Sequence, residues 1–191
     1  LQNPVYRARS FAAWQAGVDG LYIFNEYNTR CRYLREIGTP SKLKDKNNLY
    51  FVTYRNANPE SYLKNGKDYL SIPVLTPANP VNLNTNALSL QLEIGNESTP
   101  ASTVLILYTK DGKPESVKAS LNGVSLQYSK STGDGLSVFE VPKEVVNVGK
   151  NILELNGQNA GSVTLLDAAI FFYRNADDPD TQKLAQICFN D

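Results

Sequence analysis

The sequence contains no histidine, no methionine and only two cysteines among its 191 residues. The lack of histidine excludes the Ser-His and Cys-His nucleophile systems and removes the commonest ligand of transition metals. The two cysteines, Cys31 and Cys188, cannot form a zinc cluster, and we expect neither a metal site nor a cofactor. They could join the start of the chain to its end in a disulfide, or stay two separate half-buried thiols. The carboxylates, tyrosines, lysines and hydroxyls that are left suit glycoside or ester chemistry better than redox or phosphoryl transfer.

An excess of charge of either sign is also missing, since 19 lysines and arginines balance 19 aspartates and glutamates. A neutral chain has no basic field with which to release counterions from a phosphate backbone, so we expect no nucleic-acid partner. No apolar run approaches the roughly 20 residues that a membrane span requires. With 41% hydrophobic residues, the composition is that of a globular protein. Because the chain opens at Leu1 without methionine, we expect a mature or excised segment.

Residues 1–48 have the pattern of a helix, a buried strand and a second helix. Pro4 suits a first helical turn, an apolar helical face follows, and Gly17 stands where a helix would stop. Residues 21–24 are apolar on both faces, as expected of a buried parallel strand, and a polar loop then leads to a helix that Gly38 ends. This order is the unit of an α/β barrel or a doubly wound sheet. Because one buried strand cannot form a sheet, we interpret the segment as the remnant of a larger domain.

From residue 49 onward the helical periodicity gives way to that of strands. Apolar and polar residues alternate over 88–94, and residues 104–108 are apolar on both faces. Further strands are expected at 69–74, 136–141, 151–155 and 163–173, and a short helix after Asp178. Many short strands at this spacing predict an antiparallel β-sandwich over residues 49–191. Its core is expected to bury Leu88, Leu90, Leu92, Phe139, Leu153, Leu155 and Ile170.

One hairpin is predicted with a defined turn. Asn122 and Gly123 stand between residues 117–121 and 124–128, which both alternate apolar and polar side chains. Asn-Gly is favoured in two-residue hairpin turns because both positions need a positive φ. We therefore expect these two strands to pair.

Two parts of the sequence resemble known families. Residues 9–25 (RSFAAWQAGVDGLYIFN) and 34–38 (LREIG) are similar to the final barrel units of bacterial glycoside hydrolases with TIM barrels. Residues 117–123 (VKASLNG) and 141–155 (VPKEVVNVGKNILEL) resemble galactose-binding-like jelly rolls, which are common glycosidase accessory domains. The resemblance implies a mainly β chain: a jelly-roll-type antiparallel β-sandwich over 49–191, preceded by a short α/β segment over 1–48 that is the tail of a TIM barrel.

The candidate site residues follow the expected barrel strand. In α/β barrels the reacting groups project from the carboxyl ends of the strands, which here means Asn25, Glu26, Tyr27 and Asn28. Glu26 is the only carboxylate among them, whereas glycoside hydrolysis needs two. Glu26 is thus a catalytic candidate only if a missing barrel segment supplies the other carboxylate; it is otherwise a solvated loop carboxylate or a substrate hydrogen-bonder. Asn25, Tyr27 and Asn28 are the expected ligand-binding residues.

The function that the resemblance implies is that of a non-catalytic accessory β-sandwich of a carbohydrate-active protein. Its expected partners are carbohydrate and the barrel domain of a parent glycoside hydrolase, in the periplasm, at the cell surface or outside the cell. Two alternatives stay open. The chain could complete a glycosidase active site with a missing barrel segment, or it could be a purely structural domain that binds no ligand.

A segment cut out of a barrel leaves unpaired backbone and apolar surface. We therefore expect residues 1–48 to pack against the sandwich or to recruit a second copy of the chain as a homo-oligomer. Phe11 and Trp14 are the residues expected to be exposed or to contact a neighbour. On the same argument, deleting residues 1–48 should leave a folded sandwich.

Overall fold

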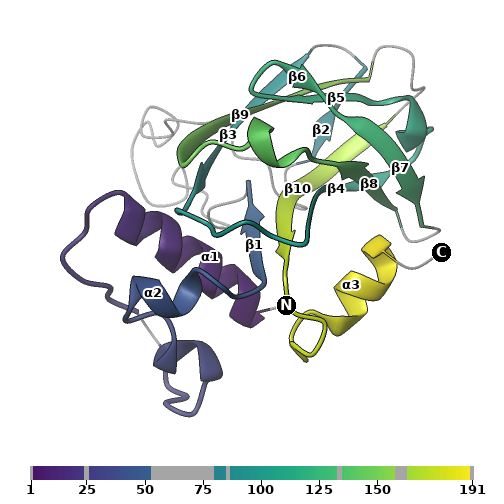
Figure 1. The fold of residues 1–191 in the computed structure, drawn as a ribbon. Coiled ribbons are helices and arrows are strands. Elements are labelled where there is room, and N and C mark those ends of the chain that lie inside the picture. Colours follow the sequence, from purple (N-terminus) through teal and green to yellow (C-terminus); the bar gives the residue numbers. More distant parts are fainter. Residues whose placement is uncertain are drawn as a thin grey trace, which may run out of the picture.

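The computed structural model describes residues 2–23, 26–52, 80–84, 87–132, 135–157 and 163–189. Two antiparallel sheets face each other, and the α-helices gather on one side of them (Figure 1). The helices are α1 (Gln2–Gln15), α2 (Pro40–Leu43) and α3 (Gln182–Phe189), and short 3-10 turns cover Arg32–Arg35, Pro114–Ser116 and Lys143–Val145. The expected mainly β class and β-sandwich are confirmed.

The larger sheet has the strand order β1-β10-β4-β8-β7, and β2 also pairs with β10. Its strands are β1 (Asn48–Phe51), β2 (Val81–Asn82), β4 (Ser102–Lys110), β7 (Gln127–Ser131), β8 (Leu136–Glu140) and β10 (Thr164–Tyr173). The smaller sheet has the order β3-β9-β5-β6, formed by β3 (Leu88–Ile94), β9 (Gly149–Asn156), β5 (Lys118–Leu121) and β6 (Val124–Ser125). The expected strand at 69–74 lies outside the described residues.

The main core lies between the two sheets, because alternate residues of each strand point inward. Leu90 and Leu92 of β3 and Leu153 of β9 meet Leu105 of β4 and Phe139 of β8 in one apolar cluster. Six of the seven residues expected in this core are buried, and Leu88 is half-buried at its edge. The period of two in the sequence therefore identified the inward face correctly.

The predicted hairpin is confirmed at its turn and cut short in its second strand. Leu121 pairs with Val124, and Asn122 (φ 51°) and Gly123 (φ 82°) both have a positive φ. The pairing ends at Ser125, however, and residues 127–131 form β7, which pairs with β8 in the other sheet. Buried Leu126 is the point where the chain leaves one sheet for the other, as happens at the corners of sandwiches.

The outer face of the larger sheet is covered by α3. Leu184, Ala185 and Cys188 of this helix pack on Val104 and Phe171, and Val5 of α1 lies against the same cluster. The short helix expected after Asp178 is thus confirmed. No helix in the described part of the chain has both the length and the apolar character needed to cross a membrane.

The N-terminal segment differs from the barrel unit expected from the sequence. Its first helix is present, but residues 21–23 form no strand and residue 24 lies outside the description. The second expected helix is reduced to the 3-10 turn at 32–35, followed after Thr39 by α2. A parallel strand needs hydrogen-bonding neighbours, and none of the described strands pairs with residues 21–23. Leu21 and Ile23 pack half-buried on a small cluster around Tyr33 instead, while Tyr22 is 86% exposed.

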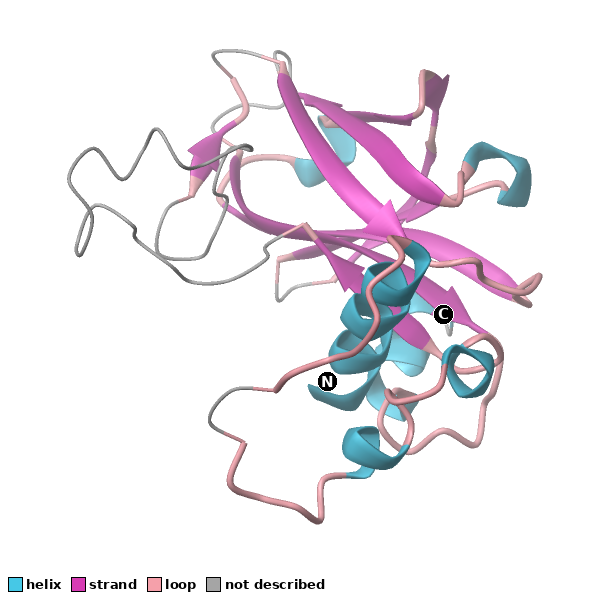
Figure 2. Cartoon of the chain, turned by 90° about the vertical axis from the view of Figure 1, so that its left-hand side faces the viewer, coloured by secondary structure: helices cyan, strands magenta, loops and turns pink. Residues whose placement is uncertain are grey.

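Helix α1 packs directly on the sandwich. Ala8 and Ala12 belong to the main core cluster, and α1 contacts β1 and β3 (Figure 2). The expectation that Phe11 is exposed was wrong, because its side chain is only 5% exposed and fills the space over Gly95. The expected packing of residues 1–48 against the sandwich is therefore present, whereas their division from residues 49–191 as a separate unit stays a prediction.

Candidate functional site

Glu26, the catalytic candidate, is held by its own loop. One carboxylate oxygen accepts a hydrogen bond from the Asn28 N–H (2.8 Å), and the other accepts one from the Tyr33 hydroxyl. The hydrogen bond from Tyr33, followed by that from Asn28, holds the pKa of Glu26 below its ordinary value. Burial, and then the hydrogen bond to Glu26, raises the pKa of Tyr33, whose ring stacks on Tyr6 at 4.1 Å.

These contacts suit an anchored loop carboxylate better than a catalytic acid. A general acid needs a raised pKa and a free oxygen near the substrate, and Glu26 has a lowered pKa and two engaged oxygens. Of the expected ligand-binding residues, Tyr27 is 87% exposed and Asn28 uses its side-chain oxygen to accept from the Arg30 N–H (3.1 Å). Asn25 lies outside the described residues.

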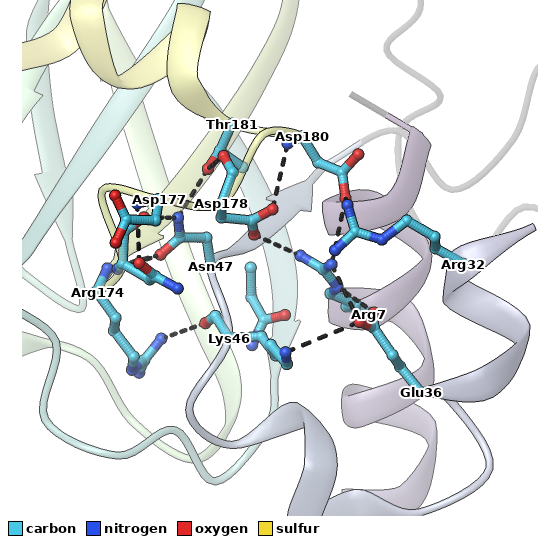
Figure 3. A network of polar contacts seen from close by, with 12 residues as sticks. Arg7, Arg32, Glu36, Lys46, Asn47, Arg174, Asp177, Asp178, Asp180 and Thr181 are labelled. Carbon is cyan, nitrogen blue, oxygen red and sulfur yellow. Dashed lines mark hydrogen bonds and ion pairs between the residues drawn. The ribbon is translucent and has the colours of Figure 1, made fainter.

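A buried ionic cluster joins α1 to the segment before α3 (Figure 3). The Arg7 side chain is fully buried, and its guanidinium contacts Glu36 at 2.6 Å, Asp178 at 2.7 Å and Asp180 at 3.3 Å. Burial acts to lower the pKa of Arg7, but the hydrogen bonds and charges of Glu36 and Asp178 outweigh it and raise that pKa. Arg32 adds a second cation at 3.3 Å from Asp180. Since these carboxylates are engaged by Arg7, the cluster is a structural clamp.

A second set of polar contacts extends the clamp across the chain (Figure 3). The amide of buried Asn47 donates to the Asn175 carbonyl and to the Thr181 hydroxyl, both at 2.7 Å, and its oxygen accepts from the Arg174 N–H at 2.7 Å. The Arg174 guanidinium donates to the Lys46 carbonyl (2.9 Å). The start of β1 is thereby fixed to the end of β10 and to the residues before α3.

Glu97, in the loop after β3, forms the far end of these contacts. One of its oxygens accepts from Asn48 (2.7 Å) and from the Tyr50 hydroxyl (2.5 Å), and the other lies 2.8 Å from the Arg174 guanidinium. The contact with Arg174 is an ion pair between two buried side chains. Burial raises the pKa of Glu97 to about 7, although Arg174, Tyr50 and Asn48 act to lower it.

The junction of α1, α2 and the loop after β3 forms a pocket of about 230 Å³, which we call the junction pocket. It is lined by Phe11, Trp14, Gln15, Pro40, Ser41, Lys44 and Asn96. Trp14 is half-buried, and its indole N–H donates to the Ile37 carbonyl at 2.7 Å, which fixes the ring. Within the described part of the chain, the side chains of Gln15, Ser41 and Asn96 make no hydrogen bond, so their polar groups are available to a ligand.

Two further pockets lie at the same end of the sandwich. One of about 130 Å³ adjoins Glu97 and Phe172, and one of about 490 Å³ lies between α3 and the strands β7 and β8. Lys143 lines both, and Glu140 lines the larger one together with Lys130. None of these three pockets is lined by two carboxylates, the pair that glycoside hydrolysis requires.

The two cysteines do not form the disulfide that the sequence left open as one of two alternatives. Cys31 and Cys188 are both free thiols, and they belong to different apolar clusters. Burial, as the largest cause, raises the pKa of each thiol, to about 12 for Cys188. Among the described residues, no group of three or more potential ligands is placed to hold a metal ion.

Neither a scan against protein-family models nor a search of the curated proteins gives a match for this chain. Sequence reasoning missed the buried Arg7 and the junction pocket. Trp14, the only tryptophan, was the one available signal, but we had expected it to face a missing neighbour.

Proposed function

We propose that this chain is a non-catalytic accessory β-sandwich of a carbohydrate-active protein, and that it binds carbohydrate in the junction pocket. The observation that carries the proposal is the composition of that pocket. A fixed indole lies beside carboxamide, hydroxyl and ammonium groups, and no carboxylate lines the pocket. A sugar ring presents apolar C–H faces and a rim of hydroxyls, so it needs one aromatic surface and several hydrogen-bonding groups.

The resemblance of residues 9–25 and 34–38 to glycosidase barrels, and of residues 117–123 and 141–155 to accessory jelly rolls, supports the same proposal. On that basis we also propose a parent glycoside hydrolase whose barrel domain lies beside this chain. The parent would act in the periplasm, at the cell surface or outside the cell.

Affinity electrophoresis in gels that contain a panel of polysaccharides tests the binding. We expect at least one polysaccharide to retard the wild-type chain and Trp14→Ala to abolish the retardation. Tyr22→Ala is the matched control, since it removes an aromatic side chain that does not line the pocket. Free migration of the wild type in every gel would favour the purely structural alternative and overturn the proposal.

The enzymatic alternative has its own test. The lowered pKa keeps Glu26 ionised, as a nucleophile must be, but Tyr33 and Asn28 occupy its oxygens. We expect no hydrolysis of nitrophenyl glycosides by the chain. Turnover that Glu26→Gln abolishes in a folded protein would place the chain among the enzymes instead.

A further inference from the structure

We infer that the junction pocket selects an acidic sugar ring, a hexuronic acid, and that Lys44 recognises its carboxylate. This inference rests on the proposed carbohydrate binding and adds the class of sugar. It is based on the positive charge of Lys44 and on the absence of carboxylates among the residues that line the pocket.

Lys44 is the single charged residue among those that line the junction pocket. Lys44 forms no ion pair with any residue in the described part of the chain, so no carboxylate there neutralises its charge. The carboxylates that adjoin the lining residues Lys44 and Asn96 in the sequence have other partners. Asp45 accepts from the Ser98 hydroxyl (2.7 Å), and Glu97 is held by buried contacts that include Arg174.

The end of α1 opposes an anion in this pocket. A helix C-terminus carries a partial negative charge of roughly half an elementary charge. Two carbonyls of the last turn of α1 are already bonded, since Ala12 and Trp14 accept from the N–H groups of Ala16 and Gly17, both at 3.0 Å. Lys44 brings a full positive charge to the same pocket. The balance therefore favours a negatively charged ligand.

The volume and the lining limit the ligand to one ring. At about 230 Å³ the pocket is smaller than the roughly 300–1,000 Å³ of pockets that enclose drug-sized ligands. Trp14 supplies the surface for the apolar face of the ring. Gln15 comes from α1 and Asn96 from the loop after β3, so hydroxyls on different sides of the ring find hydrogen-bonding partners.

Trp14 also provides the measurement. As the only tryptophan, it gives a single indole N–H cross-peak in a nitrogen–proton NMR spectrum. We would titrate the intact chain with sodium glucuronate, sodium galacturonate, glucose and galactose. At least one uronate should shift this cross-peak in a saturable way, at a concentration about threefold to tenfold below that of its neutral counterpart. Added salt should weaken only the binding of the uronate.

Two lysine variants test whether Lys44 causes the preference for the uronate over the neutral sugar. Lys44→Gln should bring the uronate affinity down to that of the neutral sugar and leave the neutral sugar unaffected. Lys42→Gln is the matched control, because Lys42 is an exposed residue of helix α2, two positions before Lys44, and does not line the pocket. Equal effects of the two variants, or equal affinity for acidic and neutral sugars, would overturn the inference.

An indole signal that none of the four sugars shifts would also overturn it. In that case, retardation of the wild type in a polysaccharide gel would show that the chain binds carbohydrate without selecting a hexuronic acid. Free migration of the wild type in every gel would contradict both the proposed carbohydrate binding and the preference for a uronic acid.

Discussion

Two buried ionic groups show how single residues in this chain differ in their response to pH. Arg7 is surrounded by Glu36, Asp178 and Asp180, and the hydrogen bonds and charges of Glu36 and Asp178 outweigh the effect of its burial on its pKa. Glu97 faces one cation, Arg174, and its burial dominates. The Arg7 guanidinium therefore stays protonated, whereas Glu97 titrates near neutrality.

Glu97 should make the stability of the protein fall as the pH rises toward neutrality. Its pKa is about 7 when folded, against an ordinary value of 4.5, so the folded state binds the proton more tightly. The stabilising contribution is full below about pH 4.5 and is lost as the pH passes about 7. Relative to Glu97→Gln, the wild-type free energy of unfolding should fall by about 1–3 kcal/mol between about pH 4.5 and pH 8.

Urea unfolding at a series of pH values measures this difference. Glu140→Gln, which changes an exposed carboxylate of β8, is the control and should follow the wild-type profile. Parallel pH profiles for the wild type and Glu97→Gln would show that Arg174 keeps Glu97 ionised throughout.

The contact between α1 and the end of β3 depends on the absence of a side chain at Gly95. A Cβ atom there would lie 2.5 Å from Cγ of Phe11, so the ring would have to move. We expect Gly95→Ala to destabilise the protein by about 1–3 kcal/mol, as overpacked cores do. Gly38→Ala is the control, because a Cβ at that position meets nothing within 4 Å.

A double variant makes the Gly95 prediction specific, with thermal unfolding as the measurement. Phe11→Leu removes ring atoms from the contact, so Gly95→Ala should be less costly in that background. If the two changes are additive, Phe11 is not the cause of the strain.

The predictability of each element follows from where its stabilising contacts lie. The alternation over 88–94 and the Asn122-Gly123 turn are local patterns, and both reappear as predicted. The expected strand is absent at 21–23 for the opposite reason, because a buried parallel strand needs partners that no described strand supplies. The shortening of the hairpin also has a long-range cause, since the residues that continue its second strand pair with β8 in the other sheet.

At the scale of the whole molecule, the candidate site depends on segments that are distant in the sequence. The junction pocket combines Trp14 of α1, Lys44 beyond α2 and Asn96 after β3. The clamp pairs Arg7 with Asp178, 171 residues further along the chain. Sequence patterns predict which face of an element is apolar, but the meeting of single polar residues across such distances is set by the tertiary packing. Glu26 was singled out because it follows one expected element directly.

The same long-range contacts lead us to expect that the sandwich does not stand alone. Deletion of residues 1–46, which stops before Asn47 and keeps β1 whole, would remove Ala8 and Ala12 from the main core. It would also leave Asp178, whose side chain is 6% exposed, without Arg7. We expect the free energy of unfolding to fall by about 5 kcal/mol or more, a large part of the stability of a typical domain.

A point variant in the full-length chain separates the clamp from the loss of packing. Arg7→Ala should cost about 3–5 kcal/mol, because it leaves buried carboxylates without their cation. Arg35→Ala, which changes an exposed arginine of the 3-10 turn at 32–35, should stay within about 0.5 kcal/mol of the wild type. Urea unfolding followed by circular dichroism measures both variants and the deletion. If the deleted chain unfolds cooperatively at the same urea concentration as the full chain, the remaining residues 47–191 are a self-standing sandwich, close to the division at residue 49 that the sequence predicts. If the deletion and Arg7→Ala both destabilise as expected, the N-terminal segment and the sandwich fold as one unit, and the junction pocket is part of that unit.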